Sequence, residues 1–430
     1  MNVAFIKCRN ILGVILILFQ LIPVSGSSQK LFDIFRKRDI NKFKSAVLKN
    51  SDLINVRNAE GSTILHLAAR NNSTPFLKII VENGAEINAQ DNDGCTALMY
   101  SSRNGNLDNV KYLLSKNADI KVRDKEGKTV LFYALENQDV LDLYLSNGGD
   151  INSTDSYGST LLMNSIQNWY SAQALFLINT GADLNIINSF NKSALYYAVN
   201  LANQPVVEAL LLKGADLNIK DKEGTSLLMI TCINKDLPMT SYLLSKGCKI
   251  TDFDNSGGSP LNYAIIVESM PIIELLVSSG ANVNSMSLLN TTPLMYACFT
   301  GNITIIDYLI QKGAEIKVKD LYGRDAFIYF FRSASNANVQ FVAKFYSLSA
   351  KSVIDLLLLH GQDINSKDNA GNTSLMYARY IGLTSIVQYL ISKGADRDLR
   401  NKDGFTAADI VKDAGFDQLY NQMVLKISDK

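Results

Sequence analysis

Asp93-Gly94-Cys95-Thr96-Ala97-Leu98 is one copy of a motif that recurs along most of the chain: a turn residue, then a Ser or Thr, then the apolar start of a helix. The turn residues are Gly61, Gly94, Gly127, Gly158, Asn191, Gly224, Gly257, Asn290, Gly323, Gly371 and Gly404. Eight of the ten intervals between them are 33 residues long, and the other two are 31 and 48 residues long. A fixed period of this length is typical of repeat proteins, in which each repeat forms one supersecondary unit.

A second turn follows the first by 23 residues in most repeats, as in Gly84-Ala85-Glu86-Ile87-Asn88 and Gly181-Ala182-Asp183-Leu184-Asn185. Apolar residues recur at helical spacing between the two turns, which predicts two short helices in each repeat. Both turns fit a left-handed backbone, which glycine adopts without strain. Asn191 and Asn290 fit the same position because Asn tolerates that backbone best among the other residues.

Six of the prolines fall in the first turn of an expected helix, where the missing N–H would have no partner in any case. They are Pro260 and Pro293 in first helices, and Pro75, Pro205, Pro238 and Pro271 in second helices. The proline positions therefore support the same register.

The segments Gly61-Ser62-Thr63-Ile64-Leu65-His66-Leu67-Ala68-Ala69 and Asn290-Thr291-Thr292-Pro293-Leu294-Met295-Tyr296-Ala297 resemble the G-x-T-P-L-H-x-A segment of the ankyrin-repeat family. The Gly-Ala-Asp-Ile-Asn-like segments complete the family pattern. The resemblance covers residues 29–430. It implies an all-α fold, an ankyrin-repeat solenoid of stacked helix-turn-helix units with β-hairpin-like connecting turns. We expect one continuous array of about 12 units, including a cap at each end.

His66 keeps the histidine of the family segment, and the resemblance implies that its ring supports the hairpin turn. Most other repeats carry Met, Tyr, Phe or Asn at this position. We expect these replacements to cost hydrogen bonds in the turns but not to change the fold.

The interval between Gly323 and Gly371 contains fifteen extra residues, at about 333–349, between the two helices of its repeat. Insertions in repeat arrays fall in loops and are often functional. The segment is either an extended helix pair that packs on its own repeat or an element that contacts a partner.

Residues 1–28 have the pattern of a secretory signal peptide. Lys7 and Arg9 precede an apolar run over 11–22, which is shorter than the roughly 20 residues that a membrane span requires. The small residues Val24-Ser25-Gly26 follow, so we expect cleavage near Gly26. An uncleaved N-terminal anchor is the alternative.

The chain carries 42 Lys and Arg residues and 41 Asp and Glu residues, a formal net charge of +1. Removal of the signal peptide leaves 40 basic residues against 41 acidic ones. This balance argues against a nucleic-acid-binding protein, which usually has a basic excess, and against strong steering of an acidic partner.

The sequence has few of the side chains that catalytic and metal sites commonly use, with 2 His and 5 Cys. We expect no enzyme activity, no cofactor and no metal site. Cys232 and Cys298 lie two repeats apart, roughly 20 Å by the stacking distance of helix pairs, whereas a disulfide needs Cα atoms within about 7 Å. The cysteines beyond the signal peptide are therefore expected to be buried side chains or free thiols: Cys95, Cys232, Cys248 and Cys298.

The resemblance implies binding on the concave face, through the hairpin tips and the ends of the first helices. Early repeats carry a charged mixture at these positions, whereas later repeats carry apolar side chains where water should lie. The residues predicted to bind protein are Tyr157, Phe190, Leu288, Leu289, Phe299, Leu321, Tyr322 and Tyr380. Leu201, Ile266, Val267 and Ile381, near the ends of first helices, are further apolar residues at positions that the resemblance assigns to this face. The alternative is tighter packing between hairpins that buries these side chains in the array.

We therefore expect a non-enzymatic protein–protein interaction scaffold that acts as a monomer and binds a protein rather than a nucleic acid. Lys-, Asn- and Ile-rich usage and the Leu-Met-Tyr form of the turn look bacterial. Together with the signal peptide, they predict a periplasmic or secreted protein of the bacterial envelope, without membrane association unless the N-terminal anchor is uncleaved. The alternative is a secreted effector that acts on a host protein.

Overall fold

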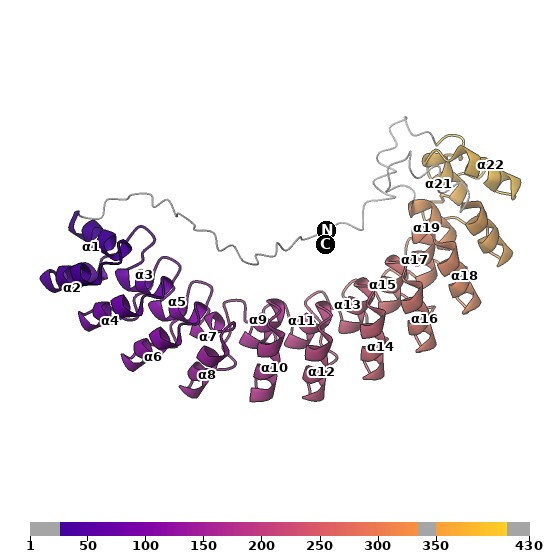
Figure 1. The fold of residues 1–430 in the computed structure, drawn as a ribbon. Coiled ribbons are helices and arrows are strands. Elements are labelled where there is room, and N and C mark those ends of the chain that lie inside the picture. The colour runs from indigo at the N-terminus through magenta and orange to yellow at the C-terminus, as the bar shows by residue number, and fades with distance from the viewer. Residues whose placement is uncertain (1–25, 334–349, 411–430) are drawn as a thin grey trace. The chain divides into compact units, whose positions relative to one another are not determined.

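The computed structural model describes residues 26–333 and 350–410. The chain packs into two compact units, Met1–Ser165 (unit 1) and Ile166–Lys430 (unit 2). Most repeats in the described ranges contribute a hairpin turn followed by a first and a second short helix (Figure 1).

Two sets of helices alternate along the chain. The first helices are α3 (Ile64–Arg70), α5 (Ala97–Arg103), α7 (Val130–Tyr133), α9 (Leu161–Gln167), α11 (Ala194–Asn200), α13 (Leu227–Ile233), α15 (Pro260–Ile266), α17 (Pro293–Thr300), α19 (Ala326–Ser333) and α21 (Ser374–Tyr380). The second helices are α4 (Thr74–Glu82), α6 (Leu107–Ser115), α8 (Gln138–Ser146), α10 (Ser171–Thr180), α12 (Gln204–Leu212), α14 (Leu237–Ser245), α16 (Met270–Ser278), α18 (Ile303–Gln311) and α22 (Thr384–Ser392). Residues 350–359 are also helical.

Capping residues set the start of the first helices. The Thr96 side chain accepts a hydrogen bond from the Met99 N–H at 3.3 Å, and the Ser259 side chain accepts one from the Asn262 N–H at 3.2 Å. Each bond satisfies an N–H that the helix itself leaves without a partner. All six prolines lie in the first turn of their helices, which confirms their predicted positions.

The hairpin turns have the left-handed backbone that the sequence predicts. All eleven first-turn residues have positive φ, including Asn191 at 55° and Asn290 at 58°. A single backbone hydrogen bond joins many consecutive hairpins, for example from the Asn92 N–H to the Glu60 carbonyl at 2.9 Å in unit 1. Hairpins therefore stack on one another through main-chain contacts as well as through the helices.

The Asn that ends the Gly-Ala-Asp-Ile-Asn-like segments links each repeat to the next. Its Oδ1 atom accepts a hydrogen bond from a backbone N–H 31 residues later in the sequence. The N–H of Asp119 donates to Asn88 Oδ1 at 2.9 Å, that of Asp216 to Asn185 Oδ1 at 2.8 Å, and that of Glu315 to Asn284 Oδ1 at 2.8 Å. The Asn is thus part of the stacking of repeats.

Stacked first helices form most of the core. In unit 1, α5 packs against α3 and α7, and in unit 2 the same arrangement continues from α11 through α13, α15, α17 and α19 to α21. Helices of seven residues are too short to be stable alone in water. Burial of their apolar side chains against the next repeat, worth roughly 1.5–3 kcal/mol for a Leu or Ile, therefore stabilises the array.

An aromatic cluster fills the N-terminal end of unit 1. There α1 (Gly26–Arg36), α2 (Ile40–Lys49) and the 3₁₀ helix η1 (Ser51–Asn55) precede the first full repeat. The Phe35 ring lies 5.1 Å from the Phe76 ring and 6.1 Å from the Phe43 ring, measured between centres. The helical repeats confirm the all-α fold; in the described ranges the hairpins add isolated antiparallel bridges, such as the one between Lys220 and Ser226.

Several expectations concern residues outside the described ranges: the signal peptide up to residue 25, the insertion from 334 to 349, and the C-terminal cap after 410. Within the described ranges, no helix has both the length and the apolar character of a membrane span. The four cysteines that the structure describes are buried and free, as the sequence predicts.

His66 supports its turn as the resemblance implies. Its Nδ1 atom accepts a hydrogen bond from the Thr63 N–H at 3.0 Å, and its Nε2 atom lies 3.0 Å from the Ala89 carbonyl oxygen of the next repeat. Met99 replaces it one repeat later, and its sulfur accepts only the first of these bonds, from the Thr96 N–H at 3.4 Å. Methionine therefore keeps the cap within the repeat and loses the link to the next one.

We expect unit 1 to lose less stability on acidification in the His66→Met variant than in the unchanged protein. Burial lowers the pKa of His66 below its usual value, so the folded state favours the neutral ring. The stabilisation is complete above the unfolded pKa of about 6.5 and is lost as pH falls below it, by at most about 1.4 kcal/mol per pH unit. Urea unfolding of both proteins at about pH 7.5 and about pH 5 measures the difference.

The same variant provides its own control at neutral pH. There it should be about 1–3 kcal/mol less stable, because the Ala89 carbonyl loses its hydrogen-bond donor. An equal pH dependence in both proteins would contradict the assigned role of His66.

Candidate protein-interaction surface

The hairpin tips and the C-terminal ends of the first helices form one surface in each unit, here called the hairpin face. In unit 2 the predicted residues at the hairpin tips are exposed, with Leu288 at 68% and Leu321 at 55% of full exposure. Phe190, Leu289 and Tyr322 are also exposed. These side chains are therefore not buried between hairpins.

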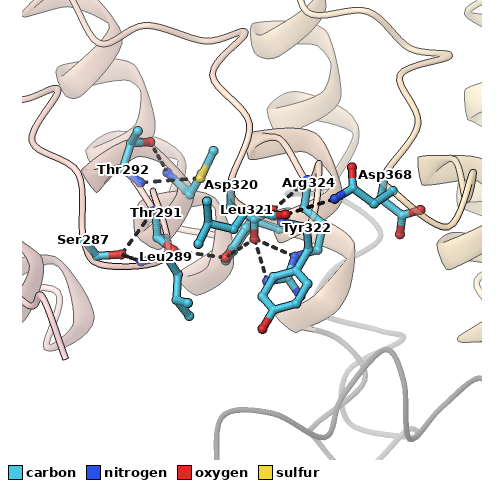
Figure 2. A network of polar contacts seen from close by, with 12 residues as sticks. Ser287, Leu289, Thr291, Thr292, Asp320, Leu321, Tyr322, Arg324 and Asp368 are labelled. Atoms are coloured by element: carbon cyan, nitrogen blue, oxygen red, sulfur yellow. Dashed lines mark hydrogen bonds and ion pairs between the residues drawn. The ribbon is translucent and has the colours of Figure 1, made fainter.

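A hydrogen-bond network fixes the backbone that carries these side chains (Figure 2). The Ser287 hydroxyl oxygen accepts bonds from the N–H groups of Leu289 at 3.2 Å and Thr291 at 3.1 Å. One repeat later, Asp320 Oδ1 accepts bonds from the N–H groups of Tyr322 at 2.9 Å and Arg324 at 2.8 Å. Each tip is thus a closed turn around one side-chain oxygen.

Main-chain bonds hold successive tips together. The Leu321 N–H donates to the Leu289 carbonyl at 3.0 Å, and the Asn369 N–H donates to the Tyr322 carbonyl at 2.8 Å. The structure therefore brings Leu289, Leu321 and Tyr322 onto adjacent hairpins, with Leu288 beside them. In Figure 2 the side chains of Leu289 and Tyr322 project to the same side of the bonded hairpins.

Arg324, which is ion-paired with Asp320, holds the Tyr322 ring in place by a cation–π contact. Arg324 and Asp320 are buried and form an ion pair with an N–O distance of 2.5 Å, and the Arg324 guanidinium carbon lies 4.3 Å from the centre of the Tyr322 ring. Tyr329 donates a hydrogen bond to the same carboxylate at 2.9 Å. Burial raises the pKa of Tyr329, so its hydroxyl remains a neutral donor at physiological pH.

The remaining predicted residues lie apart from this cluster. Phe299 and Tyr380 are half-buried at the ends of α17 and α21, Phe190 lies on an earlier hairpin of unit 2, and the exposed Tyr157 belongs to unit 1. Ile381 is a correction, because it is only 6% exposed. It caps the C-terminus of α21 with a helical backbone, which turns its side chain into the core.

Trp169 and Ile233 are among the exposed apolar side chains of unit 2 that the sequence analysis did not predict. Trp169 is the sole tryptophan of the chain, is exposed, and has a φ of 64°. A bulky residue with positive φ is strained, and the equivalent position holds Gly105, Gly301 or Gly382 in other repeats. That register could have revealed Trp169, and it places the exposed Ile233 at the same position as Phe299.

The described side chains show little chemistry beyond packing and hydrogen bonding. Burial raises the pKa of Cys248 to about 11 and that of Cys232 to about 12, so both are neutral thiols at physiological pH. Over the described ranges, no group of three or more His, Cys, Asp and Glu side chains is placed to hold a metal ion.

Comparison with known families finds matches to one family over most of the repeats. The profile described as ankyrin repeats (3 copies) matches residues 36–124, 92–155, 131–221, 195–287, 228–320, 272–347 and 342–411. Members of this family are typically non-enzymatic modules for protein–protein interaction, which indicates an interaction scaffold and a protein partner.

Two curated relatives are similar over short stretches. Human protein phosphatase 1 regulatory subunit 27 is 45% identical over 58 residues, which is 14% of this chain and 38% of that protein. Rat ankyrin repeat and SAM domain-containing protein 6 is 45% identical over 60 residues, 14% of this chain and 7% of that protein. The chain thus spans well under half of either relative. The matches along its own length show that this chain belongs to the ankyrin-repeat family.

Proposed function

We propose that this chain is a non-enzymatic scaffold that binds a protein partner on the hairpin face of unit 2, through the cluster of Leu288, Leu289, Leu321 and Tyr322. The observation that carries the proposal is the exposure of these four side chains on two bonded hairpins. A contiguous apolar patch on a water-facing surface often marks an interaction site.

The rigidity of the cluster supports this function. Asp320, Arg324 and the bond between Leu289 and Leu321 hold the tips in one geometry. A preformed surface loses little conformational entropy when a partner binds. Tyr322 combines a large apolar ring with a hydroxyl, and aromatic residues of this kind commonly dominate binding energy near the centre of an interface.

We further propose that the protein is exported and acts in the bacterial envelope, in the periplasm or outside the cell. The support is the pattern of residues 1–28 together with the start of α1 at Gly26. Leu31, Phe32 and Phe35 of α1 are buried, so a cut near Gly26 would leave every one of these packing residues in the mature chain.

The mature protein is expected to begin at or near Gly26. N-terminal sequencing of protein recovered from the cell envelope or the medium measures this, with Leu16→Arg as a variant whose interrupted apolar run should block export. Recovery of the intact chain with Met1 from the cytosol would overturn the proposal. Recovery from the medium or from host cells, rather than from the envelope, would favour a secreted effector.

A further inference from the structure

Arginine and tyrosine side chains alternate along the hairpin face of unit 1. Arg70 ends α3, and Arg103 ends α5 one repeat later. The guanidinium carbon of Arg70 lies 5.0 Å from the centre of the Tyr100 ring. That of Arg103 lies 5.7 Å from the Tyr100 ring and 4.8 Å from the Tyr133 ring. Arg103 is thus held against two aromatic rings by cation–π attraction.

The two rings are themselves fixed. The Tyr100 hydroxyl donates to Asp91 at 2.6 Å, and the Tyr133 hydroxyl donates to Asp124 at 2.5 Å. Burial raises the pKa of both tyrosines, so both remain neutral donors. Contact with an aromatic ring uses none of the N–H donors of a guanidinium, so they stay available for a planar acceptor.

A cavity of about 420 Å³ opens beside this column. Arg70, Tyr100, Arg103 and Tyr133 line it together with the hairpin segment that contains Asp124 and Lys128. Cavities of about 300–1,000 Å³ are the size of small-molecule sites, so this one has room for a single side chain.

Most charges in the cavity wall already have partners. Asp124 accepts bonds from the N–H groups of Glu126 and Lys128, both at 2.8 Å, in addition to the Tyr133 hydroxyl. Lys128 pairs with Glu126 at 2.6 Å, and Arg70 pairs with Glu60 at 3.2 Å.

Three lining charges remain. Arg103, Lys125 and Asp93 are exposed, and none of them forms an ion pair with another described residue. The exposed charges without an ion-pair partner are thus two cations and one carboxylate, whereas the Asp124 carboxylate is buried behind its three hydrogen bonds. The exposed part of the wall therefore favours an anionic group.

We propose that this cavity binds a Glu or Asp side chain from a peptide segment of a partner, with Arg103 as its anchor. A carboxylate matches the two parallel N–H donors of a guanidinium edge, an arrangement that gives short, charge-assisted hydrogen bonds. The two rings hold Arg103 in place before binding, which reduces the entropy that it loses. The site lies in unit 1 and does not require the apolar cluster of unit 2.

The test uses the full mature chain and a fluorescein-labelled peptide of alternating Glu and Ser, followed by fluorescence anisotropy. Peptides of alternating Gln and Ser and of alternating Lys and Ser serve as uncharged and cationic probes. The Glu peptide should bind, with an affinity that falls as salt rises, and Arg103→Gln should weaken it about tenfold or more, the effect of losing a charge-assisted pair.

Three further variants distinguish a specific contact of Arg103 with the peptide from a general attraction between positive charge and the peptide. Arg379→Gln removes an exposed arginine from the last turn of α21 in unit 2 and should leave binding unchanged. Arg103→Lys keeps the charge but should still weaken binding, because lysine lacks the bidentate edge. Asp93→Asn should strengthen binding about threefold by removing the unpaired carboxylate.

Several outcomes would overturn the proposal: no binding of the Glu peptide, equal binding of the Gln or Lys peptide, or equal loss of affinity in Arg103→Gln and Arg379→Gln. Preferential displacement of the peptide by single-stranded DNA would also overturn it, in favour of a nucleic-acid site. The double variant Leu289→Ser, Tyr322→Ser should bind the Glu peptide as well as the unchanged protein does. The peptide assay therefore tests the unit 1 cavity independently of the proposed binding surface in unit 2.

Discussion

Changing both Leu289 and Tyr322 to Ser should weaken partner binding by about a thousandfold while the melting temperature stays nearly unchanged. Each side chain is partly exposed on bonded hairpins, and we propose that each anchors the partner. Truncation of an interface anchor commonly costs about 2 kcal/mol or more. Two losses of this size correspond to about three powers of ten in affinity. Calorimetric titration with the identified partner measures the effect, and thermal unfolding measures stability.

Leu212→Ser is the matched control for this experiment. Leu212 is 86% exposed at the end of α12, one of the second helices, so the change has the same chemistry away from the hairpin face. It should alter neither binding nor stability. If the double variant unfolds at a much lower temperature instead, the two side chains serve hairpin packing and not a partner.

Gly257→Ala should destabilise unit 2 by about 3 kcal/mol or more, the largest effect expected from adding a single methyl group. Gly257 has a φ of 82°, and a Cβ atom there would lie 2.3 Å from the Leu288 nitrogen and 2.9 Å from the Ser287 Cα. The new atom would push apart two hairpins that are stacked through their main chains. The displaced hairpin carries Leu288 and Leu289, so partner binding should fall as well.

Gly214→Ala isolates the contribution of the contact. Gly214 has a φ of 89°, but no atom lies within 4 Å of its added Cβ. This variant therefore carries only the cost of a left-handed alanine, about 1 kcal/mol. Urea unfolding of the two variants should differ by about 2 kcal/mol, and equal stabilities would contradict close hairpin stacking at Gly257.

The repeat register was predictable from the sequence because single residues determine it. Gly and Asn at the turns reflect a backbone that other residues adopt only with strain, and the structure gives Asn191 and Asn290 the positive φ expected of them. Prolines such as Pro260 are confined to first turns by their missing N–H. These constraints are local, so the spacing along the chain reveals them.

The candidate surfaces were less predictable because they depend on contacts between repeats. The register identified Leu288 and Leu321 as apolar residues at water-facing positions of the hairpins. It also assigned Ile381 to water at the end of a first helix, but the backbone at the end of α21 turns that side chain into the core. Arg103 and Tyr133 belong to consecutive repeats, so their contact forms only when those repeats stack. The two residues also occupy different positions of the 33-residue period, so the spacing along the chain does not reveal the contact.

Site-specific photo-crosslinking tests the central proposal most directly. A photoreactive phenylalanine analogue at position 322, on the hairpin face, and one at position 212, on α12, would be activated in cells that produce the protein. We predict a discrete adduct with one protein from position 322, absent from position 212 and lost when Leu289→Ser is added. Equal adducts from both positions, or none from position 322, would contradict binding at the hairpin face of unit 2.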